Sequence, residues 1–546
     1  MLKKSALFLF GFLLIVSCKN DPKEIDNSET EIQSTQDSIE EIEYKVVDSK
    51  FIQKDSFWKN FEADLENFSE DRYKVLYDKV FEKSIPEIQQ AVKAGDISYE
   101  EIALFYLSRI NAYDREGDLS LNSIISLNPN LLQEARKKDE ELKSNPEQHM
   151  IYGIPVLLKD NINTANIPTT AGAAALQNNK VEDAFIVQRL KANGALILGK
   201  ANLSEWANFF CEDCPNGFST VGGQTLNPYK RKYFDTGGSS SGSGVAVSAN
   251  FAPVAVGSET SGSILSPASQ NSVVGLKPTI GLLSRGGIVP ISSTLDTPGP
   301  MTKSVVDNAI LLSAMTGKDS RDFASVKANK NPLDYFKDLK TADYSGIRFG
   351  VMKTLMKDTL YKKAVAELRA AGAEIVEYEA PEVNLPNFLR LLNLDMKNDL
   401  STYFKEYGGD KNYKDIQDVI DYNLKDSTAR APYGQYYFFG IVNDSASTKD
   451  FAAIKDTLST NGKMFFDEPM QRLNLDAVLS INNYHAGYAA VAHYPAITLP
   501  MGYSESGEPK GLTIIAKPFE EQKLLQWAYI YEKRAAARKP PKAYDE

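Results

Sequence analysis

A stretch rich in glycine and serine, between residues 234 and 276, constrains this chain more than any other part of its sequence. Two clusters of these residues, at 237–242 and 260–263, flank the apolar triplets Val245–Val247 and Val254–Val256. A flexible linker would not carry such triplets. Glycine lets a backbone turn sharply and approach a ligand, and serine hydroxyls can attack a substrate or relay a proton. We therefore expect two folded turns that carry chemistry.

The two clusters belong to an ordered series of motifs. The series comprises Gly153-Ile154-Pro155-Val156-Leu157-Leu158-Lys159-Asp160, Gly237-Gly238-Ser239-Ser240, Thr260-Ser261-Gly262-Ser263 and Val273-Val274-Gly275-Leu276-Lys277-Pro278. Ser239 and Ser263 are 24 residues apart. In order and spacing the motifs resemble the amidase signature family, and the similarity runs from about Ser84 to the C-terminus. The resemblance implies an α/β fold and hydrolysis of amide bonds.

The same resemblance implies the role of each motif. Ser263 corresponds to the nucleophile, Ser239 to the proton relay and Lys159 to the base. Backbone N–H groups would hold the oxyanion, and the corresponding residues are Thr260, Ser261, Gly262 and Ser263. Ser240 corresponds to a supporting residue that hydrogen-bonds the lysine, and the Gly238–Ser239 peptide bond is cis in the family. The mechanism needs no metal and no cofactor.

Lys159 suits the role of base only if its charge is suppressed. A free lysine has a pKa of about 10.4 and is protonated at neutral pH. Lys159 follows the apolar run 154–158, which predicts that it lies at the carboxyl end of a buried strand, where ligand sites of such sheets are found. Burial there would lower its pKa. A lone lysine at a strand end is more often a solvated charge, but the two serine clusters favour the catalytic interpretation.

Two residues depart from the common form of the second serine motif. Ser261 stands where the family has glycine, and Leu265 where it has arginine. A side chain at Ser261 is compatible with a negative φ. In addition, His493 replaces a usual glycine near the C-terminal part of the site. None of the three is a proposed catalytic residue, but we expect His493 to reshape the floor of the site.

Further segments resemble the bacterial peptide amidases, which remove the C-terminal amide of peptides. These segments span residues 152–163, 201–208, 222–228 and 296–300. The resemblance implies a small-molecule or peptide amide as substrate, converted to a carboxylate and ammonia. A broad-specificity amidase or esterase acting on small or acyl amides is the alternative.

Other classes of function also fit parts of the sequence. Gly238-Ser239-Ser240-Ser241-Gly242 matches the G-x-S-x-G elbow of Ser–His–Asp hydrolases, but the preceding residues 230–236 are too polar for the strand that this elbow requires. Such an enzyme would also need one of only three histidines, His149, His485 and His493. A non-catalytic binding lipoprotein is a further alternative, and the intact lysine and serines argue against it.

The N-terminus predicts export. Two lysines precede an apolar run, and Ile15-Val16-Ser17-Cys18 resembles the bacterial lipobox, so residues 1–18 are predicted to be a lipoprotein signal peptide with lipidation at Cys18. Residues 19–43 are acidic and predict a disordered tether. Lys19 favours the outer membrane. We expect a cell-envelope lipoprotein, periplasmic or surface-facing, that contacts the membrane only through its lipid.

The net charge and the number of cysteines limit which other partners and ligands the protein can have. The formal net charge is −11, which argues against nucleic acid as a partner. Besides Cys18 the chain has only Cys211 and Cys214. In an oxidising compartment these two can form a local disulfide. Two free thiols are the alternative, whereas zinc would require more ligands than the chain offers nearby.

Hydrophobic patterns predict one domain over residues 44–546, with a core motif at 150–302 and an insertion at about 383–470 that is helical and irregular. The strand–helix–strand patterns at 154–198 and 347–378 predict a large mixed, mostly parallel sheet covered by helices. Capping boxes at Ser84 and Ser98 predict helices that start there. An aromatic cluster at 433–439 favours ordinary core over a substrate pocket.

Overall fold

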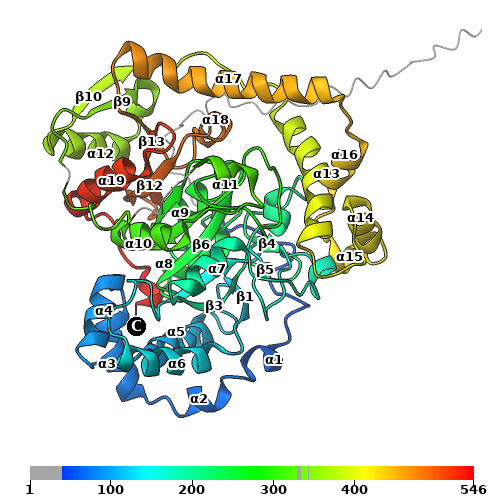
Figure 1. Cartoon of the computed structure of the whole chain (residues 1–546), viewed down its shortest axis with the longest axis vertical. Helices are drawn as coiled ribbons and strands as arrows, with labels where there is room; N and C mark the ends of the chain where they lie inside the picture. The colour runs from blue at the N-terminus through cyan, green and yellow to red at the C-terminus, as the bar shows by residue number, and fades with distance from the viewer. Residues whose placement is uncertain (1–39, 329–333, 342, 546) are drawn as a thin grey trace, which may run out of the picture. The chain divides into compact units, whose positions relative to one another are not determined.

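The computed structural model describes residues 40–328, 334–341 and 343–545 (Figure 1). The predicted signal peptide, Cys18 and tether residues 19–39 lie outside this part of the chain. Tether residues 40–43 have no helix or strand, and the Ile42 N–H donates to the Lys232 carbonyl at 2.6 Å. No helix of the described residues has both the length and the apolarity needed to span a membrane.

An 11-stranded sheet forms the centre of the fold, in the order β1-β3-β2-β6-β8-β7-β12-β13-β11-β9-β10. Its strands are β1 Ile124–Leu127, β2 Pro155–Lys159, β3 Leu196–Ala201, β6 Val254–Glu259, β7 Val274–Lys277, β8 Thr297–Thr302, β9 Arg348–Met352, β10 Glu374–Tyr378, β11 Ala477–Ile481, β12 Ala496–Tyr503 and β13 Pro509–Ala516. A separate pair joins β4 Phe218–Ser219 to β5 Gly223–Gln224.

The prediction of a mixed α/β sheet is confirmed, but parallel pairs do not predominate. Within the described sheet four pairs are parallel and six are antiparallel. Both predicted strand–helix–strand units, β2–β3 and β9–β10, are parallel. The other strands run differently because a short loop at 504–508 makes β12–β13 a hairpin, and β8 inserts antiparallel between β6 and β7.

Helices surround the sheet. Their bounds are α1 Lys54–Trp58, α2 Glu62–Glu66, α3 Glu70–Val80, α4 Ile85–Lys93, α5 Tyr99–Tyr113, α6 Leu131–Ser144, α7 Phe185–Ala192, α8 Ser241–Ser248, α9 Leu265–Gln270, α10 Val305–Met315, α11 Phe323–Ala328, α12 Thr359–Ala370, α18 Ala486–Ala492 and α19 Glu521–Ala535. The capping boxes at Ser84 and Ser98 form as predicted and start α4 and α5. Helices α8 and α9 pack on each other and on the central strands, which places both serine clusters at the sheet.

The insertion at 383–470 forms five further helices (Figure 1, yellow to orange). They are α13 Phe388–Glu406, α14 Ile416–Leu424, α15 Ser427–Arg430, α16 Tyr436–Asn443 and α17 Thr448–Arg472. The aromatic residues of the cluster at 433–439 differ in their exposure to solvent. Phe438 is fully buried and packs against Trp206 and Phe210, whereas Tyr436 and Phe439 are exposed. Phe438 thus confirms the core interpretation and anchors the insertion to the central domain.

A buried ion pair joins the ends of two neighbouring strands. Lys200 Nζ on β3 lies 3.0 Å from Oδ1 of Asp160, the residue after β2, and both side chains are fully buried. Lys200 also donates to the Ile162 carbonyl at 2.7 Å and to the Thr169 hydroxyl at 2.8 Å. The pair therefore holds the segment that follows Lys159 against the sheet.

We expect Lys200→Met to lower the free energy of unfolding by about 3–5 kcal/mol, because it leaves the Asp160 carboxylate buried without a cation. Chemical denaturation with a two-state fit measures the change. Lys74→Met is the matched control, since Lys74 belongs to an exposed pair with Glu70, and it should leave the denaturation midpoint unchanged. Equal effects of the two substitutions would contradict the prediction.

Candidate active site

Two parallel strands bring the three predicted catalytic residues to one edge of the sheet. Strand β2 ends at Lys159, and the adjacent parallel strand β6 ends at Glu259, four residues before Ser263. Parallel strands end at the same edge, so both segments meet there. The first serine cluster joins them because the Ser240 N–H donates to the Ser263 carbonyl at 3.1 Å.

The amine of Lys159 lies between these segments, shielded from solvent and next to polar groups. Its side chain is fully buried, and Nζ donates to Ser239 Oγ at 2.8 Å and to the Ser258 carbonyl at 3.0 Å. Burial lowers the pKa of Lys159 to about 7, although the Asp296 and Glu259 carboxylates act in the opposite direction. Near neutral pH, a substantial fraction of this amine can therefore accept a proton.

Ser240 supports the site differently from the prediction. Its hydroxyl donates to the Ser258 carbonyl at 3.0 Å and accepts from the Ser258 N–H at 3.2 Å. Among the hydrogen bonds of the described residues, none joins Ser240 directly to Lys159. The two residues share the Ser258 carbonyl instead, because that oxygen projects between them.

The predicted relay serine lies in a tightly enclosed turn. The Gly238–Ser239 peptide bond is cis, as the family resemblance implied. The Ser239 carbonyl accepts from the Ser204 N–H at 3.1 Å. A Cβ atom at Gly238 would lie 2.5 Å from Asn216 Oδ1 and 2.7 Å from Ser204 Oγ, so any larger residue would have to displace both side chains.

The turn 260–263 presents backbone donors beside Ser263. Gly262 has φ +85°, a conformation that favours glycine, whereas Ser261 does not have a positive φ, which explains why serine is tolerated at that position. In the described part of the chain, the N–H groups of Ser261, Gly262 and Ser263 donate to no protein acceptor. Ser263 is 8% exposed, whereas Lys159 is fully buried.

Two carboxylates that the motifs did not identify hold this turn. Glu259 Oε2 accepts from the N–H groups of Ile264 and Leu265 at 2.8 and 3.0 Å. Asp296 Oδ1 accepts from the Thr260 hydroxyl at 2.6 Å. Asp296 opens one of the segments that resemble peptide amidases, which is the only sequence signal for it. The buried side chain of Leu265 lies in an apolar cluster, so an arginine would not fit there without rearrangement.

The histidines do not support a Ser–His–Asp arrangement. His485 pairs with Ser480 Oγ at 2.6 Å and stacks on Phe465, and burial lowers its pKa to about 4. His493 ends α18 with φ +62°, which accounts for the usual glycine there. The residues before the first serine cluster form a turn and not a strand, contrary to the requirement of the G-x-S-x-G elbow.

Cys211 and Cys214 form a disulfide, so the first of the two open sequence interpretations is confirmed. The disulfide follows the short helix η2 Glu205–Asn208, in which Trp206 and Ala207 have positive φ. Within the described residues, no group of three or more His, Cys, Asp or Glu side chains is arranged to hold a metal ion.

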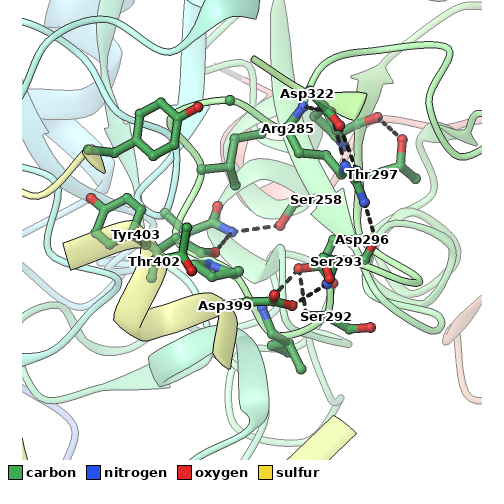
Figure 2. Close-up of a pocket in the computed structure, with 18 of the residues that line it drawn as sticks. Ser258, Arg285, Ser292, Ser293, Asp296, Thr297, Asp322, Asp399, Thr402 and Tyr403 are labelled. Carbon is green, nitrogen blue, oxygen red and sulfur yellow. Dashed lines mark hydrogen bonds and ion pairs between the residues drawn. The ribbon is translucent and has the colours of Figure 1, made fainter. Parts of the chain in front are cut away.

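A cavity of about 170 Å³ adjoins the turn that carries Ser263 (Figure 2). Its floor includes Asn161, Ser258 and Thr260, and the Asn161 side chain donates to Ser258 Oγ at 2.9 Å. The loop 285–298 and helix α13 form its walls. The Ser258 residue whose carbonyl contacts Lys159 thus also lines a space large enough for part of a substrate.

Comparison with known proteins agrees with this geometry. The profile of the family described as Amidase matches residues 101–443. A probable amidase of Arabidopsis thaliana is 35% identical over 483 residues, which cover 84% of this chain and 91% of the relative. The crystal structure of an amidase family protein from Bacillus anthracis is similar with a TM-score of 0.86 and 37% identity, covering 92% of this chain and 99% of that protein.

The native peptide amidase from Stenotrophomonas maltophilia is also similar, with a TM-score of 0.80 and 38% identity over 86% of this chain and 99% of that protein. The family match covers more than half of the chain, and these relatives align over most of their own length. The chain therefore belongs to the amidase signature family and is a hydrolase that acts on amide bonds.

Proposed function

We propose that the hydrolase works through Ser263 as nucleophile, Ser239 as proton relay and Lys159 as base. The 2.8 Å hydrogen bond between the Lys159 amine and the Ser239 hydroxyl, in a site without water access, is the observation that carries the proposal. A desolvated amine beside a hydroxyl is the arrangement that allows a lysine to accept a proton near neutral pH.

In the proposed path, neutral Lys159 takes the proton of Ser239 while Ser239 takes that of Ser263. Ser263 then attacks the amide carbonyl. The N–H groups of the 260–263 turn supply donors for the oxyanion, and those of Ser261, Gly262 and Ser263 have no competing protein acceptor in the described structure. The proton returns through Ser239 to the leaving amine, which leaves poorly without it. Water then hydrolyses the acyl-enzyme.

We propose the C-terminal amide of peptides as the substrate, with release of ammonia. Similarity to the peptide amidase from Stenotrophomonas maltophilia over 86% of this chain supports this choice, as do the shared motif segments. A relative of the same kind has been solved with the competitive inhibitor chymostatin. The second candidate is a broad-specificity amidase or esterase that accepts small or acyl amides.

We also propose that the enzyme is an exported lipoprotein of the cell envelope, anchored in the outer membrane through Cys18. The lipobox-like sequence at residues 15–18 carries this proposal. The disulfide between Cys211 and Cys214 supports it, because disulfides persist in oxidising compartments such as the periplasm.

Ammonia release from a C-terminally amidated peptide tests the activity. We expect the chain from residue 44 to release ammonia, and we expect Ser263→Ala, Ser239→Ala and Lys159→Ala each to lower kcat by more than about 10³-fold, because residues of such a unit fail together. His493→Asn is the control, since asparagine tolerates positive φ, and it should keep the activity. Activity in the Ser263→Ala variant would contradict the assignment, whereas release only from small amides or esters would favour the second candidate.

The pH dependence of kcat/KM tests the role of Lys159. Only the neutral amine accepts a proton, so kcat/KM should rise with pH and level off above an apparent pKa near 7. The Asp296 carboxylate raises the pKa of Lys159, so Asp296→Asn should move the midpoint to lower pH. Asp456→Asn, on the exposed side of α17, is the matched control. A midpoint that stays in place or moves to higher pH in Asp296→Asn would contradict the role.

Cys18→Ser tests the anchor. Without the thiol no lipid can be attached, so we expect the substituted protein to move from the membrane fraction to the soluble envelope fraction when expressed in a bacterium with a lipoprotein pathway. Fractionation with immunoblotting, beside metabolic labelling with a fatty acid, measures both effects. Membrane retention and labelling of the Cys18→Ser protein would show that another feature anchors the chain.

A further inference from the structure

One face of helix α13 forms a wall of the cavity beside Ser263. Asp399, Thr402, Tyr403 and Glu406 recur at helical spacing and all line it. The loop that carries Ser292, Ser293 and Asp296 also lines the cavity and lies next to Asp399 (Figure 2). Helix α13 belongs to the insertion, so this wall is a part of the enzyme separate from the motifs that carry the catalytic residues.

Both arginines that line the cavity already have acidic partners. Arg285 binds Asp322 through two hydrogen bonds, at 3.0 Å from Nε and 2.6 Å from Nη2. Arg321 Nε contacts Asp319 Oδ1 at 3.2 Å. Because the positive charge of the walls is compensated in this way, the cavity offers little to an anionic group of a substrate.

The acidic residues that line the cavity differ in how many donors and cations neutralise their carboxylates. Asp296 accepts from the Thr260 hydroxyl and from the N–H groups of Ile291 and Ser292. Asp399 accepts from the Ser293 N–H at 2.5 Å and also from the Ser293 side chain. In the described part of the chain, no lysine, arginine or histidine forms an ion pair with Asp399. Its neighbour Asp395, by contrast, pairs with Lys455 at 2.9 Å.

The surroundings of Asp399 disfavour its charge. Burial, together with the Asp395 and Asp296 carboxylates, raises the pKa of Asp399 to about 7. Arg285, Arg321, Asp322 and Glu406 are the other charged groups on the cavity walls. Both arginines form ion pairs with other carboxylates, although Asp296 and Asp399 also act to raise the pKa of Arg285. A cation that enters the cavity would therefore gain a carboxylate partner and would stabilise its ionised form.

The cavity is also placed to receive part of a bound substrate. Thr260 lines it and belongs to the turn that presents Ser263. Its volume of about 170 Å³ is well above the roughly 15 Å³ that a single water molecule needs. A flexible side chain of a substrate whose scissile amide lies at Ser263 can extend past Thr260 toward Asp399.

We propose that this cavity binds a cationic group of the amide substrate and that Asp399 is the residue that selects for it. The proposal rests on the peptide-amide function given above and narrows the substrate class to peptide amides that carry a basic side chain near the scissile amide. The selecting carboxylate would come from the insertion and the attacking serine from the central domain.

Paired substrates test the selection. One set consists of acetylated tripeptide amides with lysine at one of the three positions, and the other has norleucine, which is similar in length but neutral, at the same position. We expect kcat/KM for ammonia release to be about tenfold higher with lysine at one position at least, and we expect Asp399→Asn to bring this ratio close to one. The ratio is independent of the fraction of folded enzyme. Asp456→Asn, an exposed carboxylate of the same insertion, should leave the ratio unchanged.

The outcomes separate this inference from the function on which it rests. Hydrolysis of both sets with ratios near one at every position would overturn the inference and leave the peptide-amide function intact. A lysine preference that persists in Asp399→Asn would also overturn it, because selection would then come from elsewhere. If neither set releases ammonia while small amides or esters are hydrolysed, the peptide-amide function fails and the inference fails with it.

Discussion

Removal of the Lys159 amine from water is the condition on which the rest of this site depends. A solvated lysine would remain protonated and could not serve as a base. In this protein the amine is fully buried, and its two recorded contacts are a serine hydroxyl and a backbone carbonyl. Desolvation therefore prevails over the two carboxylates that favour the charged form, which brings the pKa of Lys159 to about 7.

The surrounding structure keeps Lys159 away from solvent through buried hydrogen bonds and a buried ion pair. Ser258 holds both Lys159 and Ser240 through one carbonyl, while Glu259 and Asp296 hold the two ends of the turn that carries Ser263. The buried pair of Asp160 and Lys200 secures the chain just beyond the base. Most of these groups have a defined partner, as an interior of low polarity requires. In the described structure Oε1 of Glu259 and Nζ of the buried Lys277 are exceptions without a hydrogen-bond partner.

The parallel and the antiparallel strands of the sheet position different parts of the site. Parallel strands β2 and β6 bring Lys159 and the Ser263 turn to the same edge. Antiparallel β8 returns beside β6, and this return places Asp296 next to Thr260. The insertion then adds helix α13 as a wall near the turn. The proposed catalytic groups and the walls of the neighbouring cavity consequently come from segments that are distant in sequence.

The sequence alone determined the family motifs, the capped helices at Ser84 and Ser98 and the parallel strand units, because each rests on local spacing or residue type. It also supplied, through the family resemblance, the proposal that Lys159, Ser239 and Ser263 act together. Only the tertiary structure decided the sheet order, since strand direction depends on loops and on the insertion of β8. It also revealed the supporting contacts of Ser240, Glu259 and Asp296, and the cavity at Asp399. The contact of Asp399 with the Ser293 N–H joins residues 106 positions apart, and no local pattern encodes it. The contacts of Ser240, Glu259 and Asp296 span shorter separations, but they depend on how the strands and turns pack together.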